Sequence, residues 1–448
     1  MTALKEFVLY GCIRVKFLPE FGKNMKNLET LDAGETNLVK LPESLGLLTG
    51  LKTLKLRGCK NLVCLPQSIH NLKRLLLVDI TGCSKFARLP EKLNEIEALE
   101  ELHASETDII EIPCSIGGLE KLKKLSFHGC KRSTSNSWSV ILPLKHMFWR
   151  HSIHKGLKLA ASMFNLKSLT KLDLSYCGID DGSILDGFGG LSSLWRLDLS
   201  GNKFKNLPVG CISNLLNLEI LRINSCSKLQ SLPQIPPRLG EISAEECDSL
   251  ETMEGEQLLH LFASTDQARL LGRHDHFSLI IPGREISPWF ENQTDLYLNH
   301  NGEALVMIDI PPWEEMWGIG LCTLVESDFY SSEEVMRFFW WRQNPDFLGP
   351  LDVKHCFMSK IKGEKKRKSC HLWVIFWKLP EDFCDIVQLR NYTHIPFALG
   401  YSCYDAKVSM KCGWRVIRKV DVENNGSSKS QSLLPILEQQ MDRVSHLH

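Results

Sequence analysis

Sixteen cysteines are the side chains of this 448-residue chain with the widest range of possible chemistry. Thiolates can hold metal ions, form disulfides or act as nucleophiles. A zinc site is usually nucleated by a close Cys-x-x-Cys pair, and the sequence contains none. Cys356, Cys370 and His371 could act as ligands only if folding brought them together, which makes zinc the minor alternative. We therefore expect no metal and no cofactor.

Motifs for other chemistries are also missing. The sequence has no His-Glu-x-x-His of a metalloprotease and no Gly-x-Ser-x-Gly of a hydrolase. A phosphate-binding loop needs a lysine after its second glycine, and the glycine-rich stretch that starts at Gly187 lacks it. We therefore expect no catalytic residues and no enzyme activity from these 448 residues.

Composition narrows the class of protein. The formal net charge is zero, so no global field favours nucleic acid as a partner. No apolar run approaches the roughly 18 residues of a membrane span, and Lys5 with Glu6 interrupts the N-terminal run that a signal peptide would need. We expect a cytoplasmic protein without a membrane span. The basic run at 364–368 has the composition of a nuclear signal or a phosphate-binding patch and keeps the nucleus as an alternative, although the preferred interpretation is a solvated hairpin tip.

The spacing of the cysteines follows a longer repeat. Leucines that open similar segments recur every 21 to 25 residues, with one longer gap of 47. They are Leu4, Leu28, Leu51, Leu75, Leu99, Leu122, Leu169, Leu194, Leu218 and Leu239. Each begins a spacing like that of Leu51, Leu54 and Leu56. In seven of the repeats, an apolar residue followed by proline stands further along the repeat. The pattern predicts an α/β leucine-rich-repeat solenoid of horseshoe shape, because only stacked repeats can bury these leucines.

The ninth residue of each repeat occupies a slot that turns inward where the strand ends. Cysteine suits this slot as a small buried hydrophobe with weak hydrogen-bonding capacity. We therefore expect structural, buried and reduced cysteines rather than disulfides or nucleophiles. The slot residues are Cys12, Cys59, Cys83, Cys130, Cys177, Asn202, Cys226 and Cys247, with Thr36 and Thr107 in the remaining two repeats.

Positions three, five and seven of each repeat should point away from the core onto the concave sheet. Each side chain could simply be solvated, but a wide polar concave face is what this architecture uses to hold a protein ligand. The candidates are Thr53, Lys55, Arg57, Asp79, His103, Lys124, His128, Lys171, Asp173, Arg196, Asp198 and Arg222. We expect Lys55, Arg57, His103, Lys124 and His128 to form a locally positive patch, interrupted by Asp32 and Asp79.

The pattern changes after the repeats. Short aromatic and β-branched runs separated by Pro, Gly and Asn predict an antiparallel sandwich. The expected strands are residues 277–281, 303–310, 318–325, 370–379, 395–403 and 412–422. We expect repeats in residues 1–253, with one expanded irregular repeat at 122–168, then a β-sandwich in 254–423 and a disordered tail in 424–448.

One segment resembles a known family. IIPGREISPWFENQ (280–293) is similar to the opening signature of the post-LRR jelly-roll and Ig-like domain (C-JID) of plant TIR-NB-LRR disease resistance proteins. Its signature residues here are Pro282, Gly283, Glu285, Ile286, Trp289 and Phe290. The family usually places its second proline one position earlier than Pro288. Residues 309–325 and 411–423 resemble later segments of that domain, so the resemblance covers about residues 4–423.

The resemblance implies a protein-binding sensor region of an intracellular plant immune receptor. It would recognise a pathogen effector or a host target during the defense response. In that family a TIR domain hydrolyses NAD and an NB-ARC domain binds ADP or ATP, and both would lie upstream of Met1. Leu4 opens a strand with no polar cap before it, so we expect the C-terminal part of a longer protein. The alternative is a free-standing leucine-rich-repeat scaffold or adaptor.

Overall fold

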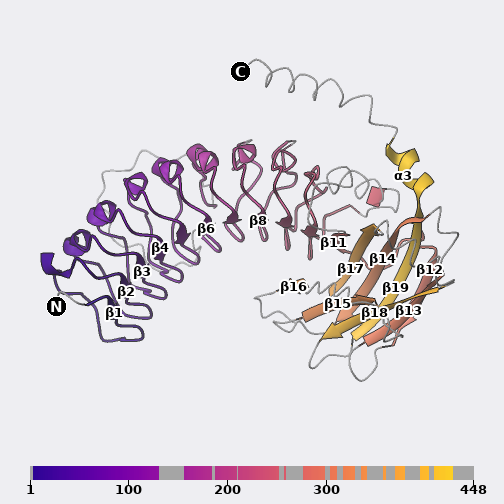
Figure 1. Ribbon diagram of the computed structural model, residues 1–448, viewed down its shortest axis with the longest axis horizontal. Helices are drawn as coiled ribbons and strands as arrows, with labels where there is room; N and C mark the ends of the chain where they lie inside the picture. The colour runs from indigo at the N-terminus through magenta and orange to yellow at the C-terminus, as the bar shows by residue number, and fades with distance from the viewer. Residues whose placement is uncertain are drawn as a thin grey trace, which may run out of the picture. The chain divides into compact units, whose positions relative to one another are not determined.

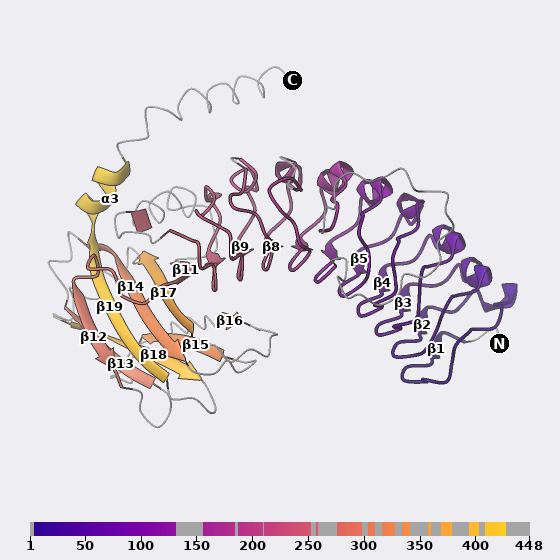
Figure 2. The same ribbon diagram turned by 180° about the vertical axis from the view of Figure 1, so that it is seen from behind.

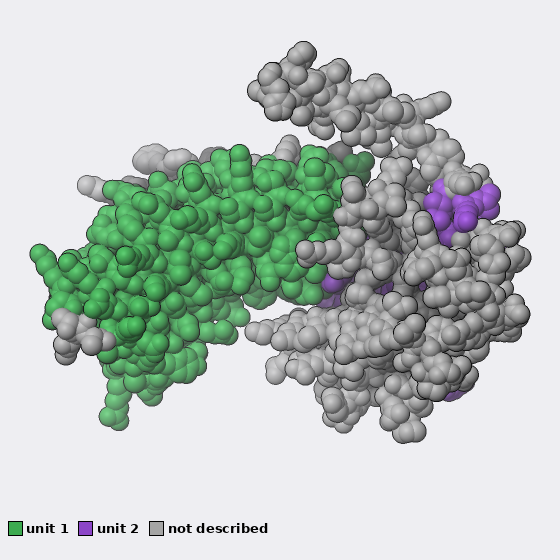
Figure 3. Space-filling view, in the orientation of Figure 1, with its two compact units in different colours: residues 1–239, 247–250 green, residues 240–246, 251–448 purple. Residues whose placement is uncertain are grey.

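The computed structural model describes two compact units. The described residues are 4–130, 156–183, 187–208, 210–251, 257–258, 276–297, 303–309, 316–327, 334–340, 357–359, 369–378, 394–402 and 408–426. The first unit comprises residues 1–239 with 247–250, and the second comprises residues 240–246 with 251–448 (Figure 3).

The first unit is a stack of three-residue strands, one for each repeat. The strands are β1 (Glu6–Val8), β2 (Thr30–Asp32), β3 (Thr53–Lys55), β4 (Leu77–Asp79), β5 (Glu101–His103), β6 (Lys124–Ser126), β7 (Lys171–Asp173), β8 (Arg196–Asp198) and β9 (Ile220–Arg222). Each pairs in parallel with the next, and equivalent positions of successive repeats lie opposite one another. The predicted leucine-rich-repeat solenoid is confirmed.

Short 3-10 helices complete most repeats on the other side of the unit. They are η1 (Lys23–Met25), η2 (Glu43–Leu47), η3 (Gln67–Asn71), η4 (Leu93–Glu95), η5 (Cys114–Gly118), η7 (Ala161–Asn165) and η8 (Phe188–Gly190). Pro42, Pro66 and Pro113 stand directly before three of them, with φ between −65° and −71°. Proline suits this place because it fixes φ and needs no partner for an N–H. Figures 1 and 2 show the strands along the inner side and the helices along the outer side.

The core of the first unit is a column of aliphatic side chains from the middle of each strand. Leu54 is fully buried between Leu31 of the preceding strand and Val78 of the following one. Phe86 and Phe127 fill the space behind the sheet and are also fully buried. Each of these side chains is buried by side chains of the preceding and following repeats, so the fold depends on the stacking of repeats.

The eighth residue of each repeat turns the chain through a positive φ. Glycine occupies this position at Gly11, Gly58, Gly82, Gly129 and Gly201, and larger residues occupy it at Glu35, Glu106, Tyr176 and Ser225. A Cβ on Gly58 would collide with the Glu35 carboxylate, and one on Gly201 would collide with the Tyr176 ring. Glu35 and Tyr176 therefore each lie over a glycine of the following repeat, whereas Ser225 is followed at this position by Glu246.

The long gap between Leu122 and Leu169 is a single expanded repeat of the inner sheet. β6 pairs directly with β7, with Lys124 opposite Lys171. A parallel bridge between Glu111 and Lys158 joins the outer segments on either side of the gap. Residues 131–155, which hold most of the expected Ser-rich loop, lie outside the described residues.

The second unit contains a mainly antiparallel sheet with strand order β10-β11-β17-β14-β19-β12 and a second sheet with order β13-β18-β15-β16. β10 (Glu241–Ser243) pairs with β11 (His276–Pro282) in parallel. The other strands of these sheets pair in antiparallel fashion. Their bounds are β12 (Asn292–Leu296), β13 (Glu303–Asp309), β14 (Met316–Ser327), β15 (Glu334–Trp340), β16 (Phe357–Ser359), β17 (Ser369–Lys378), β18 (His394–Ser402) and β19 (Val408–Arg418).

Two expectations for the second unit need correction. The sequence pattern missed β12, β15 and β16. It also extended the last strand to residue 422, whereas β19 ends at Arg418 and a helix, α3 (Lys419–Gly426), follows. The Arg418 N–H donates to the Asp421 carboxylate at 2.9 Å, which stabilises the turn into the helix. Residues 424–426 of the expected disordered tail therefore belong to α3, and the rest of that tail lies outside the described residues.

Candidate functional site

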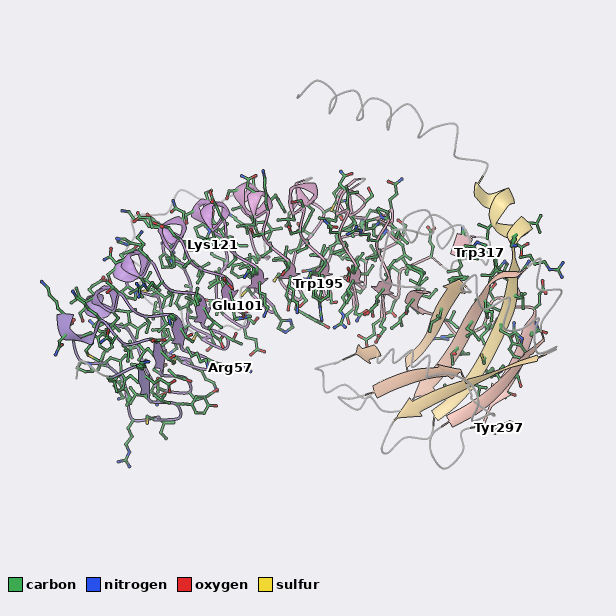
Figure 4. All side chains as sticks on the ribbon, in the orientation of Figure 1. Arg57, Glu101, Lys121, Trp195, Tyr297 and Trp317 are labelled. Atoms are coloured by element: carbon green, nitrogen blue, oxygen red, sulfur yellow. The ribbon has the colours of Figure 1, made fainter. Side chains whose placement is uncertain are left out.

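The inner face of the first unit presents the predicted side chains to solvent. Lys55 and Arg57 are exposed, and the other ten candidates at positions three, five and seven are half-buried. Alternation along each strand explains this arrangement, because position four points into the core and its neighbours point out. Figure 4 labels Arg57 and Glu101 on this strand side and Lys121 towards the 3-10 helices.

Glu101 changes the electrostatics that we expected for this face. Its carboxylate accepts hydrogen bonds from Lys124 Nζ at 2.8 Å and from His103 Nε2 at 3.1 Å. The expected positive patch is therefore wrong at these residues, since a carboxylate lies between Lys124 and His103. Glu101 occupies position three of its repeat, so the positional rule that selected Lys124 and Arg196 could have selected it too.

The pKa of Glu101 reflects these contacts. Burial acts to raise it, but hydrogen bonds from Lys124 and then from His103 outweigh burial, so the pKa is lowered from 4.5. A carboxyl group with a lowered folded-state pKa stabilises the fold above its unfolded pKa, and this stabilisation is lost as pH falls through the folded value.

We expect Glu101→Gln to lower the free energy of unfolding at neutral pH by about 1 kcal/mol, because a charged partner of Lys124 and His103 is removed. The difference from the unmodified protein should vanish in strongly acidic solution, where Glu101 is protonated in both folded and unfolded states. Thermal melts across this pH range provide the measurement. The exposed Glu120→Gln variant is the control, and a Glu101→Gln effect that does not depend on pH would contradict the account.

Charge on the strands β6 to β8 is arranged in rows. Position three carries Lys124, Lys171 and Arg196 on successive strands, whereas position five carries Asp173 and Asp198 on the last two. A partner that matched both rows would be held in one orientation, because reversing it would bring like charges together.

Lys171 lies over an aromatic ring. Its ammonium group is 4.8 Å from the centroid of the Trp195 ring, a cation–π contact on the strand side of the unit (Figure 4). This contact restricts the Lys171 side chain without removing its charge.

The aspartates at position five also build turns. Oδ1 of Asp79 accepts a hydrogen bond from the Thr81 N–H at 2.9 Å, and Oδ1 of Asp198 accepts one from the Ser200 N–H at 3.0 Å. Burial, followed by the charge of Asp173, raises the pKa of Asp198. These aspartates are therefore structural groups as well as surface charges, which sequence position alone did not reveal.

A hydrogen-bonded chain links three side chains of β6, β7 and their turns. The Ser175 hydroxyl donates to Asp173 Oδ1 at 2.5 Å and lies 2.7 Å from His128 Nδ1. Tyr176 packs edge-on against His128 at 5.5 Å between ring centroids. In a catalytic triad the histidine lies between serine and carboxylate. Here the serine is in the middle, so the arrangement orients His128 and does not activate a nucleophile in the manner of a triad.

The slot residues tie each repeat to the one before it. Cys59, Cys83, Cys130, Cys177, Cys226 and Cys247 are fully buried free thiols. Each donates to a backbone carbonyl of the preceding repeat at 3.0 to 3.5 Å. Asn202 Nδ2 similarly donates to the Leu174 carbonyl at 2.9 Å. Thr36 and Thr107 instead donate to carbonyls of their own repeats.

Cys12 does not follow this pattern. The expectation that it would be buried is wrong, because its side chain is exposed. The slot is covered by the preceding repeat, and Cys12 belongs to the first repeat that the structure describes. In the covered slots burial raises the pKa of Cys130 and Cys177, so these thiols are protonated and unreactive.

The signature residues that follow the repeats mostly pack the second unit. Ile286 and Phe290 are buried. Trp289 lies edge-on to Phe290 at 4.9 Å, and the Arg415 guanidinium lies 4.7 Å from the centre of the Trp289 ring. A Cβ on Gly283 would collide with a leucine of β17, which explains the glycine. Glu285 is exposed and Pro282 ends β11.

The described residues offer no group of three His, Cys, Asp or Glu side chains that could hold a metal ion. Cys356 lies outside them, as does the basic run at 364–368. Across the same residues, we find no helix with the length and hydrophobicity needed to cross a membrane.

Comparisons with known proteins agree on the repeats. A family model described as "Disease resistance protein RPS4B-like, leucine-rich repeats" matches residues 1–93, and a leucine-rich-repeat model matches 168–191 and 193–215. TMV resistance protein N of Nicotiana glutinosa is 34% identical over 209 residues, 47% of this chain and 14% of that protein. Disease resistance-like protein DSC1 of Arabidopsis thaliana is 33% identical over 352 residues, 70% of this chain and 26% of that protein.

A third relative has the same kind of name. Disease resistance protein RPS4 of Arabidopsis thaliana is 28% identical over 271 residues, 51% of this chain and 21% of that protein. The chain thus spans 14%, 26% and 21% of the lengths of these three relatives.

Proposed function

Because the chain contains the leucine-rich-repeat portion of a plant disease resistance protein, we propose that its repeats are the recognition region of an immune receptor. The ligand would be a protein, either a pathogen effector or the host target of one. Binding would take place on the inner face of β1 to β9.

The observation that carries this proposal is the length of the inner face. Nine parallel strands lie side by side, and each adds a row of solvent-facing side chains at positions three and five. At about 4.8 Å between strands the face is about 40 Å long. A surface of this length, with rows of opposite charge, suits a folded protein much better than a small molecule.

The second unit is proposed to be the jelly-roll and Ig-like post-LRR domain (C-JID) of the same receptors. Support comes from the signature at 280–293 and from the two β-sheets of this unit. We retain the expected limits of 1–253 and 254–423 for the two domains, and a cytoplasmic location. The TIR and NB-ARC activities are proposed to belong to other parts of the receptor, and the inner face has no catalytic role.

A free-standing scaffold or adaptor is the second candidate, because the inner face would bind a protein equally well without signalling domains. Genomic and transcript sequence upstream of Met1 separates the two. Coding sequence for TIR and NB-ARC domains joined to these repeats supports the receptor, and a short transcript that starts at Met1 supports the adaptor.

The binding test uses the two exposed cations of the inner face. Lys55 and Arg57 form no ion pair within the described part of the chain, so reversing their charge should not affect folding. We expect Lys55→Glu with Arg57→Glu to weaken binding of a cognate protein about tenfold or more through lost electrostatic complementarity. Melting temperature should stay unchanged. Lys124 is less suitable, because its reversal would place a second carboxylate beside Glu101.

The measurement is surface plasmon resonance against a panel of proteins secreted by plant pathogens and their host targets. The matched control is Lys121→Glu with Lys167→Glu, two exposed lysines outside the inner face. One outcome would contradict the proposal: a ligand binds with equal affinity to the unmodified protein, to the control variant and to the variant with Lys55→Glu and Arg57→Glu. In that case this part of the inner face is only solvated surface. The loops of the second unit would then be tested next.

A further inference from the structure

A second surface lies on the segments that follow the slot residues in the first four repeats. Residues 13–17, 39–40, 60–64 and 85–88 run side by side as a narrow parallel ladder, which we call the basic flank. The Val39 N–H donates to Lys16 O at 3.1 Å, Val63 N–H to Val39 O at 3.4 Å, and Ala87 N–H to Val63 O at 3.2 Å. Four segments at about 4.8 Å spacing give a surface about 15 Å across.

The charge of the basic flank is entirely positive. Six exposed cations lie on it: Arg14, Lys16, Lys40, Lys60, Lys85 and Arg88. Residues 12–18, 36–41, 59–65 and 83–89 contain no acidic residue. Among the described residues none of these six cations forms an ion pair. The fifth repeat has Asp108 and Glu111 in the equivalent segment, so the positive surface ends there.

The same surface exposes apolar side chains between its cations. Ile13 is 66% exposed, Phe17 60%, Val63 47% and Val39 38%. Each leaves apolar area in contact with water, and burial against a partner would stabilise it. A face that serves only for solvation would not need a phenylalanine and three aliphatic side chains on three neighbouring segments.

Hydrogen bonds organise part of this surface. Asn37 Nδ2 donates to the Ile13 carbonyl at 2.7 Å, and Asn61 Nδ2 donates to Asn37 Oδ1 at 3.3 Å. Lys85 Nζ then donates to Asn61 Oδ1 at 2.8 Å. This ladder positions the Lys85 ammonium through a neutral partner, so its charge remains available to a ligand.

We propose that the basic flank is a docking surface for an acidic segment of a protein, in which aspartate or glutamate alternates with apolar side chains. The cations would pair with its carboxylates, and the apolar side chains would cover Val39, Val63 and Phe17. This surface is separate from the inner face, and the proposal does not depend on the function proposed for that face.

The observations favour a protein segment over two other anionic partners. A nucleic acid backbone offers phosphates but no aliphatic groups to cover the exposed valines. A membrane would require apolar side chains that reach beyond the cations. Val39 and Val63 are short, and their exposure is partial, so they suit side chains that insert from a partner.

The test uses a fluorescein-labelled peptide of alternating Asp, Leu, Glu and Phe residues, with fluorescence anisotropy as the readout. We expect the unmodified protein to bind it, and Lys40→Glu with Lys60→Glu and Lys85→Glu to weaken binding at least about tenfold. The matched control is Lys26→Glu with Lys121→Glu and Lys167→Glu, which makes the same change of charge elsewhere on the unit. A peptide with serine in place of Leu and Phe should also bind much more weakly.

Several outcomes would overturn the proposal. One is equal peptide binding by the flank variant and the control variant. Another is equal binding of the serine peptide, which would leave only nonspecific charge attraction. Vesicles of phosphatidylserine and phosphatidylcholine, and a duplex DNA, are measured in parallel. If either binds to the flank and the peptide does not, the occupant is a membrane or a nucleic acid. Lys55→Glu with Arg57→Glu should leave peptide binding unchanged, which separates this test from that of the inner face.

Discussion

Replacement of Cys83 by aspartate is expected to lower the free energy of unfolding by about 3–5 kcal/mol, because it places an unpaired carboxylate in a fully buried slot. The Cys83 thiol donates to the Leu56 carbonyl at 3.1 Å. A carboxylate has no hydrogen to donate there and would face that oxygen directly. Cys83 is completely inaccessible to solvent, so water cannot compensate.

Asparagine at the same position is the matched control. It has the size and shape of aspartate, and Asn202 shows that an amide can occupy the slot by donating to the Leu174 and Leu199 carbonyls. We expect Cys83→Asn to be clearly more stable than Cys83→Asp in urea denaturation. If the two variants unfold at the same denaturant concentration, charge burial is not the cause. Cys114→Asp, at an exposed cysteine, should have little effect.

The penalty of Cys83→Asp should also depend on pH. Burial would raise the folded-state pKa of the new aspartate above its unfolded value of about 3.9. The penalty is then absent below the unfolded pKa and grows as pH rises towards the folded one. Cys83→Asn has no such group, so the difference between the two variants should shrink in acid.

Truncation of Leu54 to alanine is expected to cost about 2–5 kcal/mol, because it leaves a cavity in the column between Leu31 and Val78. Leu216→Ala is the matched control, since Leu216 is 61% exposed and the same atoms are removed. Urea denaturation measures both. Equal stability of the two variants would contradict the stacked core.

Hydrogen exchange offers a second measurement for Leu54→Ala. In a linear stack each repeat contacts mainly its neighbours, so the loss of stability should be greatest near the cavity. We expect faster exchange of the amides of β2, β3 and β4 than of those of β8. Uniform acceleration across the unit would indicate that the repeats do not respond individually.

The period of the leucines was enough to predict the strands of the first unit. Stacking imposes one register on all repeats, so the residue at position four of each repeat must point into the core, as Leu54 does. Ion pairs were not predictable in the same way. Glu101 and Lys124 are 23 residues apart, and only the parallel register brings them together. The expected positive patch was wrong at His103 and Lys124, because Glu101 was left out of it.

The prediction that all slot residues are buried was wrong for Cys12, in the first repeat that the structure describes. The sequence shows which residues occupy the slot but not that the preceding repeat covers it, so Cys12 was expected to be buried. The described strands that follow β10 show no repeating sequence pattern, and their pairings link distant segments such as Phe277 with Phe376. Short runs such as β16 have too few residues to show a period of two.

The two close contacts between a large residue and a glycine at the eighth position restrict how the gene can change its number of repeats. Tyr176 lies over Gly201, and Glu35 lies over Gly58. Duplication of the Tyr176 repeat alone would set one tyrosine against another where the chain has room only for glycine. Duplication of a repeat with glycine, such as that of Gly82, adds no such conflict. Unequal recombination should therefore be tolerated where the repeat on the C-terminal side has glycine at its eighth position. A repeat with a large eighth residue such as Tyr176 must then precede a repeat with glycine there, and not another repeat like itself.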